Sequence, residues 1–322
     1  MKKLVVLLMV VSLVCAANAA TVRYQGSGDW FSTIAPDGSG SGWYLNGQAA
    51  PHTTVVPAPG DTCRFNYGGN TVTLSAPVPT TVGNFQAGVD ESGTLVVNAG
   101  GSLTTTADSK VGNNNFSTGT LIINAGGVVN NGAWFGVAVG NGGVKSSVYG
   151  ATTGIVEING GTLNITSHLW MATGGANASS GGSPTSMAYM TINDGGVVKV
   201  SGNIGLGTIN ASTASAGLGQ ATINVNSGGL LDLWQWSATT SIQAGSVLNI
   251  NGTGVVKIMG NRGADAEAYF ALGKIASDKG GIQWVYTPGD LGQDYTTITA
   301  IPEPATMVLL GLGAAALVRK KK

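Results

Sequence analysis

The chain has 322 residues, a formal net charge of zero at pH 7 and only 9% charged residues, so it lacks the cationic surface of a nucleic-acid-binding protein. Hydrophobic residues make up 43% of the sequence, which excludes the weakly hydrophobic, highly charged composition of disordered chains. The 52 glycines favour short strands joined by tight turns, and two cysteines are too few for a disulfide-stapled scaffold.

Residues 1–20 contain the three parts of a secretory signal peptide. Lys2 and Lys3 give a cationic start, 4–14 is an apolar stretch, and the small residues at 17–19 suit a signal peptidase. We expect signal peptidase to cleave immediately after that triplet or one residue later. The apolar stretch is too short to be read as a membrane span.

The cysteines leave two alternatives open. Cys15 would suit lipoprotein acylation if a small residue preceded it, and Val14 disfavours that interpretation. Removal of the signal peptide leaves Cys63 alone, without a partner for an internal disulfide. We favour a small buried hydrophobe at this position over a reactive or intermolecular thiol.

Residues 21–92 are expected to form an N-terminal cap and the first coil of an all-β fold. A turn at 57–61 precedes strand-like residues at 64–66 and 68–74. This stretch resembles the opening of many bacterial β-helix surface proteins, in which a Trp-rich start leads into a Pro-Gly-Asp turn. The aromatic residues that carry the resemblance are Trp30, Trp43, Tyr44, Phe65, Tyr67 and Phe85.

Six related segments fill residues 93–261. Each has an apolar-x-apolar-Asn core, a glycine-containing turn and a second apolar strand, and they recur every 25 to 35 residues. The strands have a period of two, so helix-containing solenoids and four-stranded propeller blades do not fit. We predict a right-handed parallel β-helix whose repeats resemble those of autotransporter-like and pectate-lyase-like proteins. The alternative is a series of unrelated Asn-Gly hairpins.

The recurring asparagines have a physical reason to stack at one corner of the coils. Asparagine tolerates left-handed backbone, and stacked amide side chains can bond to one another along a ladder. The glycines that follow permit positive φ in the same turn. The predicted structural ladder consists of Asn98, Asn124, Asn159, Asn193, Asn226 and Asn251.

Residues 262–300 are expected to form a small C-terminal cap. The composition of 264–275 suits a short helix, and 282–286 and 295–299 have the pattern of two strands. A cap is required because the end of a solenoid exposes unpaired strand edges and an open core.

The segment 301–322 combines three elements in a fixed order: a Pro-Glu-Pro box, an apolar stretch at 305–318 and a basic end. It resembles the PEP-CTERM sorting domain. The resemblance implies processing by an exosortase-type protease, a Gram-negative-type host that makes extracellular polymeric material, and delivery to the cell surface, outer membrane or extracellular matrix. The residues of the box and of the basic stop are Pro302, Glu303, Pro304, Arg319, Lys320, Lys321 and Lys322.

The apolar stretch of this segment is shorter than the roughly 20 residues that span hydrocarbon. We therefore expect a hydrophobic helix that enters the membrane transiently, with its cationic end on the cytoplasmic side, rather than a durable anchor. The alternative is a buried C-terminal helix.

The sequence indicates no catalytic, cofactor-binding or metal site. A β-helix polysaccharide lyase or hydrolase would need grouped carboxylates, whereas the repeats supply about one acid per coil and in different columns. His52 and His168 are far apart and lack metal-ligand spacing. The acids of the repeats are Asp108, Glu157, Asp194 and Asp232.

Trp234 and Trp236 are two residues apart and would share one strand face, so they are the candidate glycan platform. Core packing is the alternative for these and for the other aromatic side chains of the repeats. We expect a secreted, surface-sorted structural or adhesive protein that associates with extracellular polysaccharide and is not an enzyme. The alternative is a carbohydrate-active β-helix enzyme.

Overall fold

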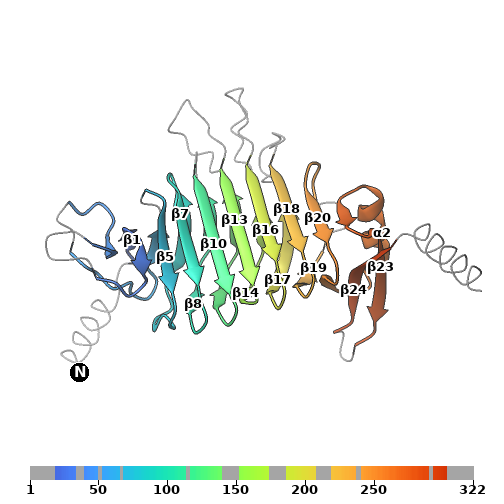
Figure 1. The fold of residues 1–322 in the computed structure, drawn as a ribbon, viewed down its shortest axis with the longest axis horizontal. Coiled ribbons are helices and arrows are strands. Elements are labelled where there is room, and N and C mark those ends of the chain that lie inside the picture. The colour runs from blue at the N-terminus through green and yellow to red at the C-terminus, as the bar shows by residue number, and fades with distance from the viewer. Residues whose placement is uncertain are drawn as a thin grey trace, which may run out of the picture.

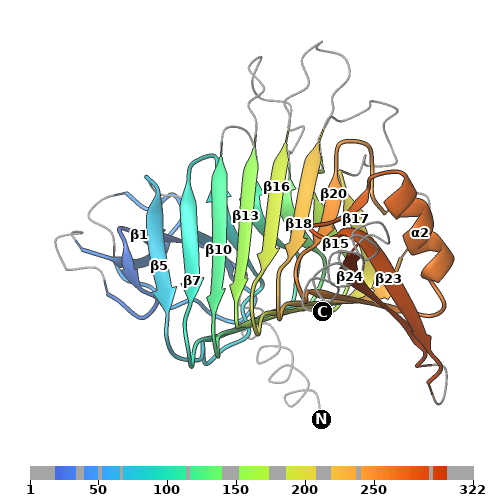
Figure 2. The ribbon, with the colours of Figure 1, turned by 45° about the vertical axis from the view of Figure 1, so that its right-hand side comes forward.

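A computed structural model shows the chain as a parallel β-helix closed by a cap at each end (Figures 1 and 2). The structure describes residues 19–33, 40–49, 53–65, 68–113, 117–139, 152–173, 186–207, 219–236, 241–289 and 293–302. Most of the expected signal peptide, and the sorting segment after Pro302, lie outside these residues.

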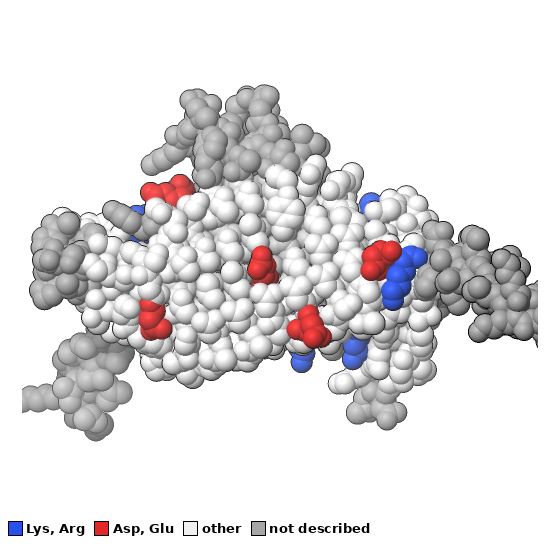
Figure 3. Space-filling model, in the orientation of Figure 1, with Lys and Arg blue, Asp and Glu red and all other residues white. Residues whose placement is uncertain are grey.

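The first face of the β-helix is a sheet of nine parallel strands that stack side by side along the rod (Figure 1). Equivalent residues of successive coils pair directly, as in Gly93 with Gly119 and Gly119 with Gly154. The surface seen from this side is mostly uncharged, with a few scattered acidic and basic side chains (Figure 3). In order the strands are β2 (Gly28–Asp29), β5 (Asn70–Leu74), β7 (Gly93–Val97), β10 (Thr118–Asn124), β13 (Thr153–Asn159), β16 (Met187–Ile192), β18 (Gln220–Val225), β20 (Val247–Ile250) and β22 (Ile275–Ser277).

The second and third faces join into one sheet because β17 (Val197–Leu206) continues from one to the other, with an irregularity between Val200 and Asn203. The second face also contains β8 (Ser102–Thr105), β11 (Val128–Asn131), β14 (Thr162–Ile165), β19 (Leu230–Gln235), β21 (Val255–Met259), β24 (Tyr295–Pro302) and β23 (Gly280–Thr287). The third face contains β3 (Gly42–Leu45), β1 (Thr21–Gln25), β4 (Thr62–Phe65), β6 (Asn84–Val89), β9 (Ser109–Asn113), β12 (Phe135–Val139) and β15 (Leu169–Met171).

The core consists of the side chains that alternate inward along each short strand. Because the strands stack in register, inward residues of one coil lie on those of the next and form columns. Full burial of each large aliphatic side chain stabilises the fold by about 1.5–3 kcal/mol. One column, fully buried throughout, contains Leu95, Leu121, Val156, Met190, Ile223 and Leu248.

A second column marks the corner at the end of the third face, where the backbone adopts positive φ in coil after coil. Glycine occupies three of the five positions, and Ala138 and Ala172 occupy the others with φ of 54° and 53°. A non-glycine residue in this region costs about 1–2 kcal/mol, and both alanines are fully buried, so the surrounding coils enforce the corner. The glycines are Gly88, Gly112 and Gly207.

The N-terminal end is closed by an aromatic cluster under β1 and β3, the antiparallel pair at the start of the third face. The Trp30 and Trp43 rings meet at 4.7 Å between centroids, and the Trp43 indole N–H donates to the Trp30 carbonyl at 2.9 Å. Tyr24 and Phe65 complete the cluster at 5.2 and 5.3 Å from the Trp43 ring. The Trp-rich start therefore covers the open end of the core.

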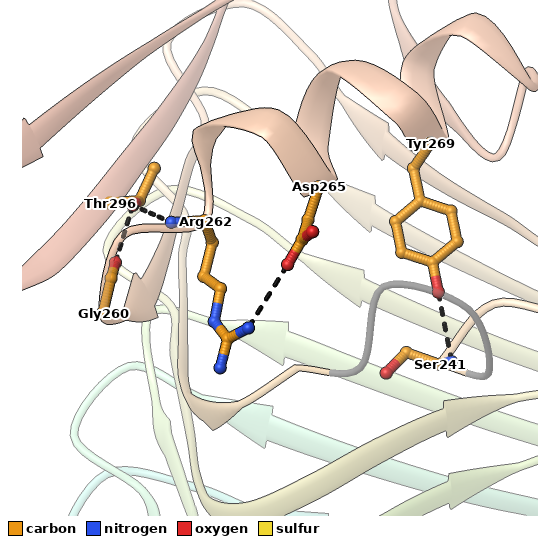
Figure 4. A network of polar contacts seen from close by, with 6 residues as sticks. All are labelled: Ser241, Gly260, Arg262, Asp265, Tyr269 and Thr296. Carbon is orange, nitrogen blue, oxygen red and sulfur yellow. Dashed lines mark hydrogen bonds and ion pairs between the residues drawn. The ribbon is translucent and has the colours of Figure 1, made fainter.

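The C-terminal end is covered by helix α2 (Gly263–Ala271) and by β24, which pairs antiparallel with both β21 and β23. The Thr296 hydroxyl connects β24 to the segment that leads into α2. It accepts from the Arg262 backbone N–H and donates to the Gly260 carbonyl, both at 2.7 Å (Figure 4). The helix is shorter than the sequence predicts: it ends at Ala271, and Ile275, the last residue expected in it, begins β22, which adds a parallel strand to the first face. The described residues contain no helix long and apolar enough to cross a membrane.

Candidate functional site

The six predicted ladder asparagines lie in one column beside the first face. The Asn124 amide nitrogen donates to the Asn98 oxygen at 2.8 Å, and Asn193 donates to Asn159 at 2.6 Å. The remaining steps, from Asn159 to Asn124, Asn226 to Asn193 and Asn251 to Asn226, measure 3.5, 2.8 and 2.9 Å. Each amide from Asn124 to Asn226 thus donates to the preceding coil and accepts from the next, and the five bonds fix the relative register of six coils.

Two further pairs of stacked asparagines, outside the ladder, were not predicted. Asn164 donates to Asn130 on the second face, and Asn249 donates to Asn224 on the first, each at 2.8 Å. These residues sit in the middle of strands rather than at the turn, so the repeated Asn-Gly pattern does not mark them. In the sequence Asn224 and Asn249 each stand two residues before a ladder asparagine, whereas Asn130 and Asn164 follow theirs by six and five residues.

Trp234 and Trp236 do not form a shared platform, and that prediction is wrong. Trp234 is 49% exposed, whereas Trp236 is 4% exposed and its ring meets Tyr269 of α2 edge-on at 5.2 Å. Strict alternation fails within β19 itself, because the pairing with β17 shifts register between Leu233 and Gln235. Gln235 is therefore exposed, and Trp236 is buried in the core. Trp236 belongs to the packing of the C-terminal cap, and Trp234 alone faces solvent.

Trp234 lines a cavity of about 250 Å³ on the outer surface of the second face, between β17, β19, β21 and the start of β24. Lys199, Asp232 and Lys257 occupy paired positions on neighbouring strands and form a column of alternating charge in its floor. No ion pair within 4.0 Å joins these three described side chains. The cavity therefore offers two cations and a carboxylate beside an exposed indole.

The β24 side of this cavity is held by a second set of contacts. The Lys257 ammonium lies 3.8 Å from the centroid of the Tyr295 ring. The Tyr286 hydroxyl donates to the Asp294 carboxylate at 2.8 Å, and this hydrogen bond is the main cause that raises the pKa of Tyr286 above its ordinary value. These contacts orient Tyr295 and Asp294 at the rim, from a strand that follows the repeats.

The cavity contains two carboxylates, Asp232 and Asp294. Within the described ranges, no three His, Cys, Asp or Glu side chains gather in a way that could hold a metal ion. His168 lies elsewhere: its Nδ1 accepts the Asn203 backbone N–H at 2.9 Å, and its ring is 5.6 Å from that of Trp170. An indole face with separated charges suits binding of a polar ring compound such as a saccharide.

The Pro-Glu-Pro box begins at the last residue that the structure describes. Pro302 is the last residue of β24 and pairs with Gly280 of β23, so the box starts inside the cap and not after it. Glu303, Pro304 and the basic stop at 319–322 lie outside the described residues, as does the hydrophobic helix predicted between them.

One comparison with known protein families identifies the C-terminal segment. Residues 300–322 match the model of the PEP-CTERM protein-sorting motif. No curated protein and no solved structure was found to match the chain. The chain therefore carries a PEP-CTERM sorting signal, which marks it as an exported protein of a Gram-negative bacterium and as a substrate for exosortase recognition.

Proposed function

We propose that the protein is a structural or adhesive rod at the cell surface or in the extracellular matrix, and that it contacts matrix polysaccharide through the cavity at Trp234. The observation that carries the proposal is an indole that is 49% exposed beside polar side chains on an otherwise regular sheet. A stacked β-helix suits such a role because its rigid surface can present side chains in fixed rows.

The adhesive part is tested with the polysaccharide fraction purified from the matrix of the producing bacterium, immobilised on a gel. We expect the folded chain to be retained and Trp234→Ala to lose most of that retention. Leu272→Ala is the matched control, because Leu272 is also exposed, at 69%, but lies outside the cavity. If the unaltered chain is not retained, adhesion through this cavity is refuted and only the scaffold role is left.

The same polysaccharide fraction tests the alternative that the protein is an enzyme. The two carboxylates of the cavity are the reason to test it. Incubation with the polysaccharide should release no new reducing or unsaturated ends. Release that disappears in Asp232→Asn would favour a lyase or hydrolase and overturn the structural role.

Surface delivery is tested by deleting residues 302–304 and fractionating the cells. We expect the deleted chain to remain in the membrane or periplasmic fractions. Unchanged delivery would contradict sorting to the surface through the Pro-Glu-Pro box.

A further inference from the structure

A row of outward-facing side chains runs along the third face, well away from the cavity at Trp234. Strand register places Arg23 beside Arg64, Arg64 beside Gln86, and Gln86 beside Lys110. Neighbouring strands are about 4.8 Å apart, so the row follows the axis of the rod. Three cations of a chain with only 9% charged residues are thus collected in one line.

The row continues through two tryptophans. Lys110 pairs with Gly136 on the neighbouring strand. A Cβ atom at Gly136 would fall 2.5 Å from Cζ3 of Trp134. Because glycine has no side chain, the Trp134 ring can lie over the sheet at this position. The Lys110 ammonium is 5.4 Å from the centroid of that ring. On the next strand Trp170 pairs with Gly136 and extends the row.

The cations of the row have no carboxylate within ion-pair distance among the described residues. Arg23 Nε is buried without a hydrogen-bond partner, and Arg64 Nε donates to a neutral acceptor, Gln86 Oε1, at 3.1 Å. Half-buried cations that repel one another are costly unless an anion completes the site.

Two acids lie near the row, and neither completes it. Burial lowers the pKa of Arg64 and of Lys110. Asp90 partly offsets this effect at Arg64, and Asp108 does so at Lys110. The Asp108 carboxylate accepts the Trp134 backbone N–H at 3.3 Å. It therefore supports the indole rather than pairing with Lys110.

We propose that this row, Arg23, Arg64, Gln86, Lys110, Trp134 and Trp170, binds a linear acidic polysaccharide that lies along the rod. Cations at one end would bind the carboxylates of the polymer, and the indoles at the other end would stack on its sugar rings. The inference rests on the proposed association with matrix polysaccharide and adds a second site and a charge class. A nucleic acid is disfavoured because the chain has no net positive charge.

The test measures binding of alginate, a linear polyuronate, by the folded chain at several salt concentrations. We expect Arg64→Gln combined with Lys110→Gln to weaken binding about tenfold or more and to flatten the salt dependence. The matched control, Lys274→Gln combined with Lys279→Gln, changes the net charge equally but lies outside the row. It should bind alginate like the unaltered chain.

Trp170→Ala is the second variant, because it keeps every cation. It should weaken alginate binding and leave the salt dependence unchanged, and unaltered thermal unfolding would show that the variants fold. Equal weakening by the row and control pairs would overturn the proposal, as would tighter binding of an oligothymidylate than of alginate. Trp234→Ala should still bind alginate, so failure of the cavity and failure of the row give different results.

Discussion

The backbone N–H of Ala20 donates to Oδ1 of Asp61 at 2.8 Å, and Asp61, the aspartate of the Pro-Gly-Asp turn, is 5% exposed. Its other carboxylate oxygen accepts the Ala58 N–H at 2.8 Å. If signal peptidase cleaves after Ala19, the new terminal ammonium takes the place of the Ala20 amide beside this carboxylate. Processing would then replace a neutral amide donor by a charged ammonium, so that both partners of the hydrogen bond carry a charge.

In a chain that starts at Ala20, Asp61→Asn should lower the free energy of unfolding by about 1–3 kcal/mol, the range for hydrogen bonds to charged groups. In a chain extended by a few residues before Ala20 the same change should cost less, because the donor there is a neutral amide instead of an ammonium. Urea unfolding of the four proteins measures the difference. Equal costs in both backgrounds, or a different first residue when the exported protein is sequenced, would rule out the ion pair.

The asparagine ladder makes a second prediction. Asn159→Ala leaves the Asn193 amide without its acceptor and the Asn124 oxygen without its donor, so we expect a loss of about 1–3 kcal/mol in unfolding free energy. Asn203→Ala, at an exposed side chain outside the ladder, should change stability by less than about 0.5 kcal/mol. Equal effects at the two positions would show that the ladder bonds add nothing to stability.

Alanine substitutions of Trp234 and Trp236, the two residues of the predicted platform, should differ clearly in their effect on the free energy of unfolding. Trp236→Ala removes a buried ring that packs on Tyr269 and should cost about 3–5 kcal/mol. Trp234→Ala should stay within about 0.5 kcal/mol of the unaltered chain, because its side chain faces solvent. Thermal or urea denaturation measures both, and a large loss for Trp234→Ala would contradict the exposure described above.

Cys63 gives a pH-dependent prediction. Burial, with a smaller effect of the Asp61 carboxylate, raises the pKa of this thiol well above its ordinary value. The unfolded chain loses the proton near pH 8.5 while the folded chain keeps it, so stability should fall as pH rises from 8 to 10. The loss should exceed that of Cys63→Ala by about 1–2 kcal/mol. Identical pH profiles for the two chains, or rapid alkylation of the folded chain, would contradict a buried protonated thiol.

The asparagine column could be predicted because a parallel β-helix turns a sequence repeat directly into a spatial column. The burial of Trp236 could not, since period-two reasoning fails already at Gln235, where the pairing of β19 with β17 shifts register. The basic row was also missed. Arg23 and Arg64 precede the repeats whereas Lys110 lies within them, and only the register of the third face brings the three together.

The last strand of the cap, β24, ends at Pro302, where the sorting box begins. If the apolar stretch at 305–318 enters a membrane, as the sequence predicts, only residues 303 and 304 separate it from β24, and we expect the C-terminal cap to face the bilayer. The aromatic cap at the other end of the rod then points outward (Figure 1). The cavity at Trp234, which borders β24, would then lie near the lipid. The basic row, which begins at Arg23 in β1, would lie farther from the membrane, in the extracellular matrix.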